Sequence, residues 1–478
     1  MMKKISKVQL IKFIIYSIIF VAMVIWIGNY WLLPGLIIIF DIYISKKVPW
    51  SFWKKRKDGE KPSKIVEWVD ALVFALVAVY IINLFFFQNY KIPTSSLEKS
   101  MLVGDHLFVS KMTYGPRMPF TPLAFPLVQN SFPIINTKSY TDWPKWNYKR
   151  LKGFKKVERN EIVVFNFPTG DTVPFFHTNP DYYITIRELG MNQIAQNPSL
   201  IKNKTFNNEY ELREFTNEIG RNIVKNHEKE FGKVYYRPVD RRDNYVKRCV
   251  ALPGDTFEIK NNQIYINGEI SADAPGVQYN YHVITDGTLL NQNFFERLEI
   301  SNDDKIQGGI GPHYILPLTE EKAEQVKKYN FIISVKKDEQ LAATSRELVY
   351  PFSQNYPWSR DNYGPLTMPK KGATIELTID NILLYERIIT AYENNTLKVK
   401  GGKIFINDVE VNSYTFKQDY YFMLGDNRHK SADSRYWGFV PEDHIVGRPI
   451  LVWLSLNKDK SFPSNIRWNR FFKVVTSE

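Results

Sequence analysis

"ALVFALVAVYIINLFFFQNYKIPTSSLEKSMLVGDHLFVSKMTYGP", residues 71–116, joins a long apolar run directly to two adjacent serines and a segment with strand character. Residues 71–87 contain no charged side chain, and their length approaches the roughly 20 apolar residues with which a helix crosses a bilayer. Residues 106–114, "HLFVSKMTY", are rich in residue types that strands favour. A Ser-Ser pair at such a border is usually a polar cap or a turn, because serine hydroxyls bond readily to nearby backbone. The rest of the chain has to decide between that interpretation and a chemical role for Ser95 or Ser96.

The composition favours a β-rich protein with more than one structural unit. With 478 residues, of which 44% are hydrophobic and 24% charged, the chain can bury a substantial core. Its aromatic content of 15% and its short runs of Tyr, Phe, Val, Ile and Thr between turn residues favour strands. The single cysteine, Cys249, excludes an internal disulfide. The net charge of +13 indicates an acidic partner, either nucleic acid or an anionic membrane, and the position of the charge discriminates between them.

Two further apolar runs, residues 11–28 and 31–44, precede the first stretch. A cleaved signal peptide is the weaker interpretation, because no small-residue cleavage site follows the first run. We therefore predict a transmembrane hairpin over residues 1–45. Each arm is short for a bilayer span, so a single tilted span followed by an interfacial segment is the alternative.

The positive charge is concentrated between the apolar runs, in a loop predicted over residues 46–69. Residues 46–64, "KKVPWSFWKKRKDGEKPSK", carry eight Lys or Arg against two acids and include Trp50 and Trp53. Basic residues beside interfacial tryptophans are typical of a cytoplasmic loop on the membrane surface, which favours membrane lipids over nucleic acid as the partner. The next membrane helix, predicted over 70–88, then leads outward. The positive-inside rule predicts a multi-pass protein of the cytoplasmic (inner) membrane, with the rest of the chain on the extracytoplasmic, periplasmic side.

The predicted fold class is mainly β, with N-terminal transmembrane helices followed by an extracytoplasmic antiparallel β domain that carries large α/β insertions. The predicted divisions are a β core at 89–169, 245–269 and 419–460, insertions at 170–244 and 270–418, and a C-terminal tail at 461–478.

Two hairpin patterns resemble each other. Residues 258–269, "EIKNNQIYINGE", and 398–409, "KVKGGKIFINDV", place Asn261-Asn262 and Gly401-Gly402 at tight turns. This suggests a repeated hairpin near 396–408 in the cap-like second insertion, with chance similarity as the alternative.

Four blocks carry a resemblance to a known family. The blocks are "IPTSSLEKSMLVGDHLFVSKMTYG" (92–115), "RNEIVVFNFP" (159–168), "YVKRCVALPGDTF" (245–257) and "YFMLGDNRHKSADSRYWGFVPEDHIVGRP" (421–449). The two last blocks are long and mix several chemical classes, which makes them specific. At these blocks the chain resembles bacterial type I signal peptidases (leader peptidases), which are membrane serine proteases with a Ser-Lys dyad.

The resemblance implies a membrane-bound endopeptidase that removes signal peptides from exported precursor proteins. Family members cut after a small-x-small motif through an acyl-enzyme on the serine, and they need neither cofactor nor metal. Exported preproteins would be the substrates, the protein translocation machinery a candidate partner, and nucleic acid no partner. The catalytic β core would be of signal-peptidase type.

The family pattern separates the two serines by register. Its nucleophile lies three residues after the proline and eight before the Gly-Asp of the first block, so Pro93 and Gly104 both select Ser96. Ser95 then matches the small spacer. Thr94 matches the hydroxyl that forms the oxyanion hole with the backbone N–H of Ser96, where donors aimed at the developing negative charge lower the barrier. A plain turn hydroxyl is the alternative for Thr94.

The general base implied by the "YVKR" match is Lys247. A free lysine has a pKa near 10.4 and holds its proton at neutral pH, so burial has to depress this value. Strand alternation places Tyr245 and Cys249 on the same face as Lys247, which supplies an apolar setting for the amine. The alternative is that Lys247 and Arg248 are ordinary surface cations.

The last block supplies supporting residues. The resemblance implies that the Ser431 hydroxyl bonds to the lysine amine and orients it, and that Asp433 and Arg435 form an ion pair that holds the site together. An Asp-x-Arg pair on a loop is more often structural than catalytic, so we expect these two residues to act as a clamp.

The substrate pocket is expected to be shallow and apolar, with the substrate backbone paired to strand edges. Ordinary β core is the alternative for these positions. Ser96 also follows Gln88 by only eight residues, which holds it near the bilayer surface where a signal segment emerges. The matching positions are Ile92, Met101, Tyr245 and Val246.

The chain departs from the common family pattern in two short stretches. Leu97, Glu98 and Lys99 stand where Met-x-Pro is usual after the nucleophile, and His429-Lys430 stands where Asp-Asn is frequent. Loss of the proline predicts a less rigid catalytic turn, with fine specificity and pH optimum in doubt.

Other mechanisms fit less well. The seven histidines show no paired ligand spacing, which argues against a zinc protease. A self-cleaving repressor protease shares the chemistry but would need a DNA-binding module and no membrane spans. An inactive membrane-anchored homologue would have lost Ser96 or Lys247, and both are present.

Overall fold

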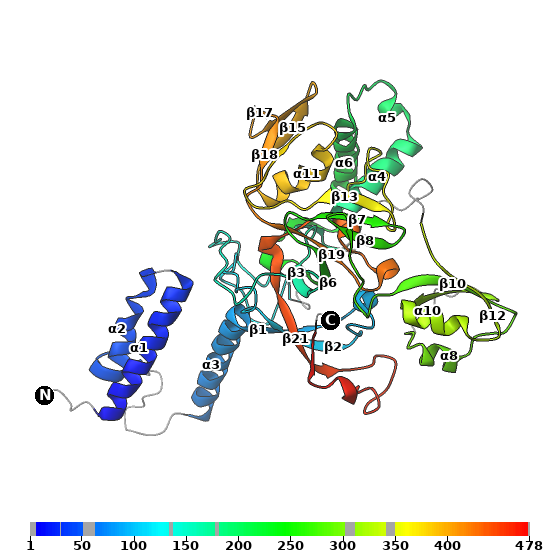
Figure 1. Cartoon of the computed structure of the whole chain (residues 1–478). Helices are drawn as coiled ribbons and strands as arrows, with labels where there is room; N and C mark the ends of the chain where they lie inside the picture. Colours follow the sequence, from blue (N-terminus) through cyan, green and yellow to red (C-terminus); the bar gives the residue numbers. More distant parts are fainter. Residues whose placement is uncertain are drawn as a thin grey trace.

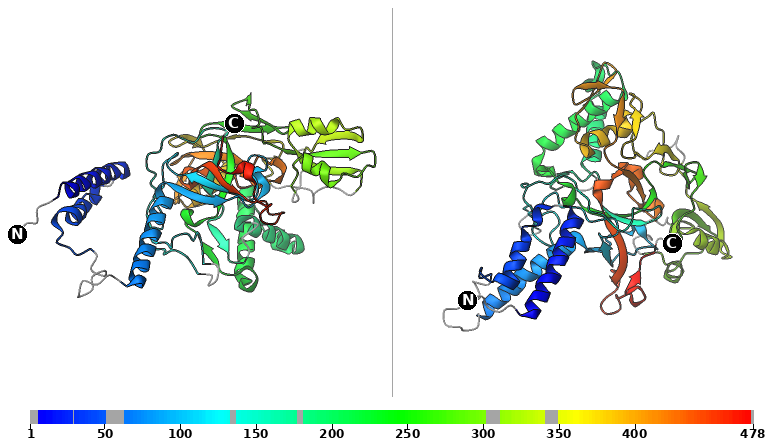
Figure 2. Two further views of the ribbon diagram at one scale, coloured as in Figure 1. Left: turned by 90° about the horizontal axis from the view of Figure 1, so that it is seen from below. Right: turned by 60° about the vertical axis from the view of Figure 1, so that its left-hand side comes forward.

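The computed structural model describes residues 6–28, 30–50, 63–132, 137–176, 181–301, 311–340 and 349–476. Residues 51–62 of the predicted basic loop, including Trp53, lie outside these residues. The described chain is β-rich, with a curled antiparallel sheet and apolar helices at its N-terminal end. Figures 1 and 2 show these helices on one side of the β-rich body.

Two helices are long and apolar enough to cross a membrane, namely α1 (Lys7–Ile27) and α3 (Lys64–Phe85). A capping box between Ser6 and Gln9 starts α1, and Gly28 ends it in the left-handed conformation. The ends of α1 and α3 meet, because the rings of Trp26 and Phe85 lie 6.3 Å apart. Both helices therefore reach the β domain with their C-terminal ends.

The chain folds back along α1 in a shorter second arm. This arm consists of α2 (Gly35–Phe40) and the short π-helix η2 (Asp41–Ser45). The two arms are held by ring contacts, with Phe13 against Phe40 at 5.8 Å and Tyr16 stacked on Tyr43 at 5.2 Å. At 1.5 Å per residue the second arm spans about 16 Å. The predicted hairpin thus has one arm of membrane length and one that is about half as long as a bilayer core.

Helix α3 begins and ends earlier than the predicted 70–88. Ser63 accepts a hydrogen bond from the N–H of Val66, which starts the helix at Lys64 inside the stretch predicted as loop. At the other end, residues 87–91 pair with a strand instead of continuing the helix. The C-terminal boundary of α3 therefore depends on the pairing of residues 87–91 with residues 106–110, which sequence periodicity does not reveal.

The β core is an eight-stranded sheet in the order β1-β2-β21-β3-β6-β19-β20, with β22 paired to β21. The pairings between its described strands are antiparallel. The sheet curls, because the turn after β1 contacts β6 although three strands separate them in the order. The strands are β1 (Phe87–Lys91), β2 (Asp105–Ser110), β3 (Ile162–Asn166), β6 (Asn244–Ala251), β19 (Tyr420–Leu424), β20 (Val440–Pro441), β21 (Ile445–Ser455) and β22 (Lys473–Val474).

Strand β3 is buried along its whole length and divides the core in two. Ile162 and Val164 belong to an apolar cluster on one face, while Val163 and Phe165 belong to a second cluster on the other face, as the two-residue period of a strand requires. Lys247 lies opposite Val163 in the β3–β6 register.

Three modules lie between core strands in the order of the described chain. The first, with α4 (Tyr182–Gln196) and α6 (Glu209–Asn226), is a helix pair in close contact, because a Cβ at Gly220 would lie 1.8 Å from the Ile186 carbonyl oxygen. The second has its own apolar core around β10 (Tyr279–Thr285), β11 (His313–Leu318) and β12 (Ile332–Lys337), with α8 (Gln292–Arg297) and α10 (Glu320–Lys327). The third contains α11 (Ile382–Arg387) with β14 (Thr374–Glu376) and β18 (Ser413–Thr415).

The two similar sequence patterns form the same structure. β7 (Thr256–Lys260) and β8 (Gln263–Ile266) make one hairpin, and β15 (Leu397–Lys400) and β16 (Lys403–Ile406) make the other. Both central residues of each turn have positive φ, at 49° and 67° for Asn261-Asn262 and at 57° and 75° for Gly401-Gly402. This is the turn that asparagine and glycine favour in tight hairpins.

Candidate active site

Ser96 lies on the short helical turn η4 (Ser95–Leu97) that follows β1. The preceding Ile92 is fixed by two backbone bonds, in which its N–H donates to the Asp105 carbonyl at 2.8 Å and its carbonyl accepts from the N–H of Gly104 at 3.0 Å. From the opposite side, the N–H of Asn427 donates to the Ser96 carbonyl at 3.0 Å, and the Asn427 side-chain amide donates to the Ser95 carbonyl at 3.3 Å. The turn is therefore anchored at both ends.

The side chain of Lys247 points from β6 to this turn. Its Nζ lies 2.5 Å from the Ser96 Oγ, and both residues are buried, at 3% and 8% exposure. Burial lowers the pKa of Lys247 from 10.5 to about 8, while the charges of Asp433 and Asp426 oppose this shift. An amine with this pKa is largely able to accept a proton in mildly alkaline solution.

Thr94 is exposed, and its Oγ1 lies 3.5 Å from the Ser96 Oγ. The first N–H groups of a helical turn have no acceptor within the turn, which leaves the N–H of Ser96 available. The Thr94 hydroxyl and the Ser96 N–H are therefore two donors next to the Ser96 Oγ.

Asp433 and Arg435 form a buried two-point ion pair. The Nε and Nη2 atoms of Arg435 donate to the two Asp433 carboxylate oxygens at 2.9 and 2.8 Å. Asp433 also accepts from the N–H of Gly425 at 3.2 Å, and Arg435 donates to the carbonyls of Arg428 and Arg360. The pair thus holds together the loop that carries Asn427 and the segment around Arg360.

Ser431 is buried beside the turn that carries Ser96, and the structure does not join its hydroxyl to Lys247. In the described residues that hydroxyl donates to the Ala432 carbonyl at 3.4 Å. A Cβ at Gly425 would lie 2.2 Å from the Ser431 Oγ and 2.6 Å from the Ser96 carbonyl oxygen. Glycine at 425 therefore allows the Ser431 side chain and the catalytic turn to approach each other.

The structure brings three of the four pocket candidates together and sets the fourth apart. Ile92 and Met101 are buried in one cluster, and Val246 packs against it. Tyr245 packs on the opposite face of the sheet, with its ring stacked on Phe167 at 4.5 Å, because adjacent strand residues point to opposite faces. The Tyr245 ring lies 5.7 Å from the Lys247 Nζ, so it belongs to the apolar surroundings of the amine.

A second buried ion pair, which the sequence reasoning missed, braces the site. The Nε and Nη2 atoms of Arg248 donate to the two Asp426 carboxylate oxygens at 2.7 Å each, and the Ser100 hydroxyl donates to Asp426 at 2.5 Å. The two charges stand in different sequence blocks, next to Lys247 and Asn427. No local pattern in either block indicates this pairing, which only the folded chain brings together.

Residues of the predicted second insertion (270–418) reach the turn that carries Ser96. Lys99, with φ at 76°, donates through Nζ to the carbonyls of Leu298 and Glu299. The N–H of Gln278 donates to the Asp426 carbonyl at 2.8 Å, and the Gln278 carbonyl accepts from the N–H of Arg428 at 3.0 Å. The turn that lacks the usual proline is therefore held by contacts with the insertion.

His429 also has a defined partner, although it departs from the family pattern. Its Nε2 lies 3.0 Å from Asp361, and its Nδ1 accepts from the N–H of Asn280 at 3.2 Å. Burial lowers the pKa of His429, against the opposing effect of Asp361. In the described parts of the chain, no group of three or more His, Cys, Asp or Glu side chains is placed to hold a metal ion.

A buried serine hydroxyl in contact with a buried amine, beside donors for an oxyanion, has the parts of a serine hydrolase. The family described as "Signal peptidase, peptidase S26" matches residues 65–305 and 372–454, which is more than half of the chain. The chain belongs to this family and is a serine endopeptidase of the signal peptidase I type.

Several curated relatives share this resemblance. The chain is similar to "Signal peptidase I" of Buchnera aphidicola subsp. Baizongia pistaciae, with 24% identity over 436 residues that cover 90% of each chain. It is 22% identical to that of Buchnera aphidicola subsp. Acyrthosiphon pisum over 403 residues, or 83% of this chain and 78% of the relative. "Signal peptidase I" of Haemophilus influenzae is 48% identical over 56 residues, which cover 12% of this chain and 16% of the relative.

Proposed function

We propose that this protein removes signal peptides from exported precursor proteins, cutting after a small-x-small motif by Ser-Lys dyad chemistry. The observation that carries the proposal is the 2.5 Å contact between the buried Lys247 Nζ and the Ser96 Oγ. Membership of the signal peptidase family supports the substrate class.

In the proposed mechanism the neutral Lys247 amine takes the proton of the Ser96 hydroxyl as Oγ attacks the scissile carbonyl carbon. Negative charge on the carbonyl oxygen is stabilised by the Thr94 hydroxyl and the Ser96 N–H. The Lys247 ammonium then gives its proton to the leaving amine as the C–N bond breaks, which leaves an ester on Ser96. A water molecule, deprotonated by Lys247, attacks this ester and releases the new carboxylate, while Ser96 regains its proton.

Two free backbone edges suit a substrate that binds as a strand. In the described part of the chain, β1 pairs with β2 alone. β6 pairs with β19 only from Arg248 onward, which leaves residues 244–247 unpaired on that side. An extended peptide can hydrogen-bond to such edges and place alternate side chains into a pocket. The cluster of Ile92, Met101 and Val246 is the pocket that we propose for the small residues.

This specificity predicts a strong effect of side-chain size in the precursor. Replacing the small residue just before the cut with leucine should lower kcat/KM by about a hundredfold, because a filled pocket resists extra volume. The check is the rate of appearance of mature protein, with its new N-terminus sequenced. Leucine at the middle position of the motif is the control, since that side chain points to the face of the sheet opposite the pocket. Equal rates for the two substrates would contradict the proposed pocket.

We also propose that the β domain lies on the extracytoplasmic face of the inner membrane, near anionic lipids and the translocation machinery. Since α1 and α3 both reach the β domain with their C-terminal ends, they run in the same direction, and the segment between them has to return. The basic residues of that segment favour the cytoplasmic side.

Reporter fusions test this topology. A fusion after Tyr30 should be active only as an extracytoplasmic reporter, and a fusion after Lys46 only as a cytoplasmic one. An extracytoplasmic signal at Lys46 would replace the hairpin with a single span and an interfacial arm.

A further inference from the structure

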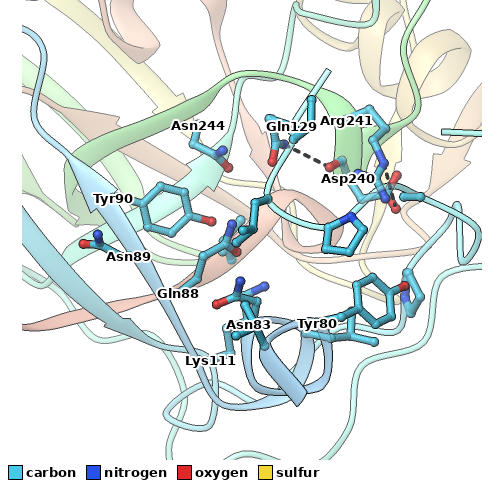
Figure 3. A pocket seen from close by; sticks show the side chains of 18 of the residues that line it. Tyr80, Asn83, Gln88, Asn89, Tyr90, Lys111, Gln129, Asp240, Arg241 and Asn244 are labelled. Atoms are coloured by element: carbon cyan, nitrogen blue, oxygen red, sulfur yellow. Dashed lines mark hydrogen bonds and ion pairs between the residues drawn. The ribbon is translucent and has the colours of Figure 1, made fainter. Parts of the chain in front are cut away.

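A cavity of about 530 Å³ lies where α3 meets the β domain. Figure 3 shows its lining, with Tyr80 and Asn83 from α3, Gln88 to Tyr90 from β1, and Gln129 and Asn244 across the space. The helix is tied to the cavity wall by the Tyr80 hydroxyl, which donates to the Pro122 carbonyl at 2.9 Å. The cavity therefore stands at the border between the membrane anchor and the catalytic core.

Some polar side chains of this cavity are already engaged. Arg117 donates to Asn166 at 2.8 Å, Arg241 donates to the Thr121 hydroxyl at 2.7 Å, and Gln129 donates to the Asp240 carbonyl at 3.0 Å. These bonds belong to the wall of the cavity.

Four other side chains at the cavity have no such partner. Within the described ranges, the side chains of Asn83, Gln88, Tyr90 and Lys111 make no hydrogen bond or ion pair. Lys111 is the one cation of this group, and burial lowers its pKa to about 7, with Arg117 adding to the effect. The cavity thus presents donors that lack acceptors.

The cavity is on the route to Ser96. Asn244 precedes Lys247 by three residues on β6, which is about 10 Å along a strand, and Gln88 precedes Ile92 by four residues, about 13 Å. The three residues of the small-x-small motif would lie at the pocket beside Ile92 and Lys247. Three or four residues further from the cut, a substrate strand on the free edges would reach the cavity, which is about four to seven residues before the cut. The membrane-embedded part of a precursor precedes its cut, so this part arrives from the side of α3.

The unpaired donors match the end of a helix. The last four carbonyls of a helix have no acceptor role within it, and that end carries partial negative charge. When an apolar helix leaves the bilayer, these carbonyls need donors. A phosphate headgroup would favour several free cations. Of the three described cations that line the cavity, Arg117 and Arg241 are engaged, and only Lys111 has no partner.

Resting on the proposed function, we propose that this cavity receives the precursor segment between the apolar signal helix and the cleaved bond, with Asn83, Gln88 and Lys111 donating to the carbonyls at the end of that helix. The cavity is thus a binding site for the backbone of the helix end, separate from the pocket that reads small side chains.

The kinetic test compares two substrates with the full-length, detergent-solubilised enzyme. One is a complete precursor, and the other is a short peptide that spans the motif without the apolar helix. Lys111→Met should lose about tenfold in kcat/KM on the precursor, with the loss confined to that substrate. Lys111→Arg should retain most of the activity, and Lys156→Met, which removes an exposed cation outside the cavity, is the matched control.

The outcomes separate the hypotheses. An unchanged rate on the precursor, or equal losses on both substrates, would overturn the site. A loss that appears only in vesicles containing phosphatidylglycerol, and not in neutral detergent, would reassign the cavity to a lipid and also overturn it. If the wild-type enzyme cleaves neither substrate, the proposed function fails instead.

Disulfide trapping gives a positional readout that does not depend on turnover. Cys249 is buried, so a cysteine introduced at Gln88 in a Ser96→Ala background is the reactive thiol. Mild oxidation should join Gln88→Cys to precursor cysteines placed about four to seven residues before the cut. Lys156→Cys should not cross-link. A cross-link yield that is flat along the precursor would contradict the placement.

Discussion

Ser96→Ala is expected to lower the rate of precursor cleavage by about four orders of magnitude or more, since loss of a serine nucleophile removes the covalent route altogether. Alanine fits the space of the serine, and the bonds that hold the turn involve the backbone carbonyls of Ser95 and Ser96. Precursor binding should therefore persist. Single-turnover cleavage with excess enzyme measures the chemical step, and a binding assay on the same variant confirms that the substrate is still held.

Ser95→Ala is the matched control, because the two serines share the same turn and similar burial, at 7% and 8% exposure. The Ser95 carbonyl keeps its bond from Asn427 whichever side chain is present. Activity should stay within a few-fold of wild type. Loss of cleavage in Ser95→Ala together with normal cleavage in Ser96→Ala would move the nucleophile by one residue.

Two rules lead from the sequence to the two residues at the centre of the site. The register of the family pattern, set by Pro93 and Gly104, selected one serine, and strand alternation placed Lys247 on the face shared with Tyr245. The structure joins Lys247 and Ser96 across 151 positions of the chain. Neither rule states that contact by itself, and the family resemblance was needed to bring the two blocks together.

The bracing of the site was not predictable from local pattern. The pair of Arg248 and Asp426 spans 178 positions, and periodicity says which face a residue takes but not which distant residue it meets. The same limit applies to Ser431, whose placement against Gly425 depends on how two loops approach each other.

The insertion contacts change the expectation for the catalytic turn. The missing proline predicted a less rigid turn, yet Lys99 is tied to the carbonyls of Leu298 and Glu299, 199 and 200 positions away. The loop around Asp426 is held in the same way. Gln278 bonds to its backbone, and His429 contacts Asn280 and Asn262. Rigidity that a proline supplies locally is here supplied by tertiary contacts, and a sequence reading restricted to the turn could not include them.

Lys247→Met is the second change with a large expected effect. Methionine keeps the length and the apolar stem but cannot accept a proton, so cleavage should fall by at least about a thousandfold. Burying a thioether beside Tyr245 avoids the desolvation cost of an amine, so the melting temperature should be equal to or above that of the wild type. Loss of activity with retained stability, measured on one preparation, would separate the chemical role of Lys247 from a structural one.

The pH profile of the wild-type enzyme identifies the same group independently. Lys247 acts as a base only when neutral, and its pKa is lowered to about 8. Below that value the protonated amine accumulates, so kcat/KM should fall about tenfold for each pH unit, whereas above it the rate should level off. The pH at which kcat/KM falls identifies the base, because a carboxylate base would give a fall only in strongly acid solution. A kcat/KM that stays flat from about pH 5 to 9 would exclude an amine with this pKa as the base. The contact between Lys247 and Ser96 would then have no catalytic role.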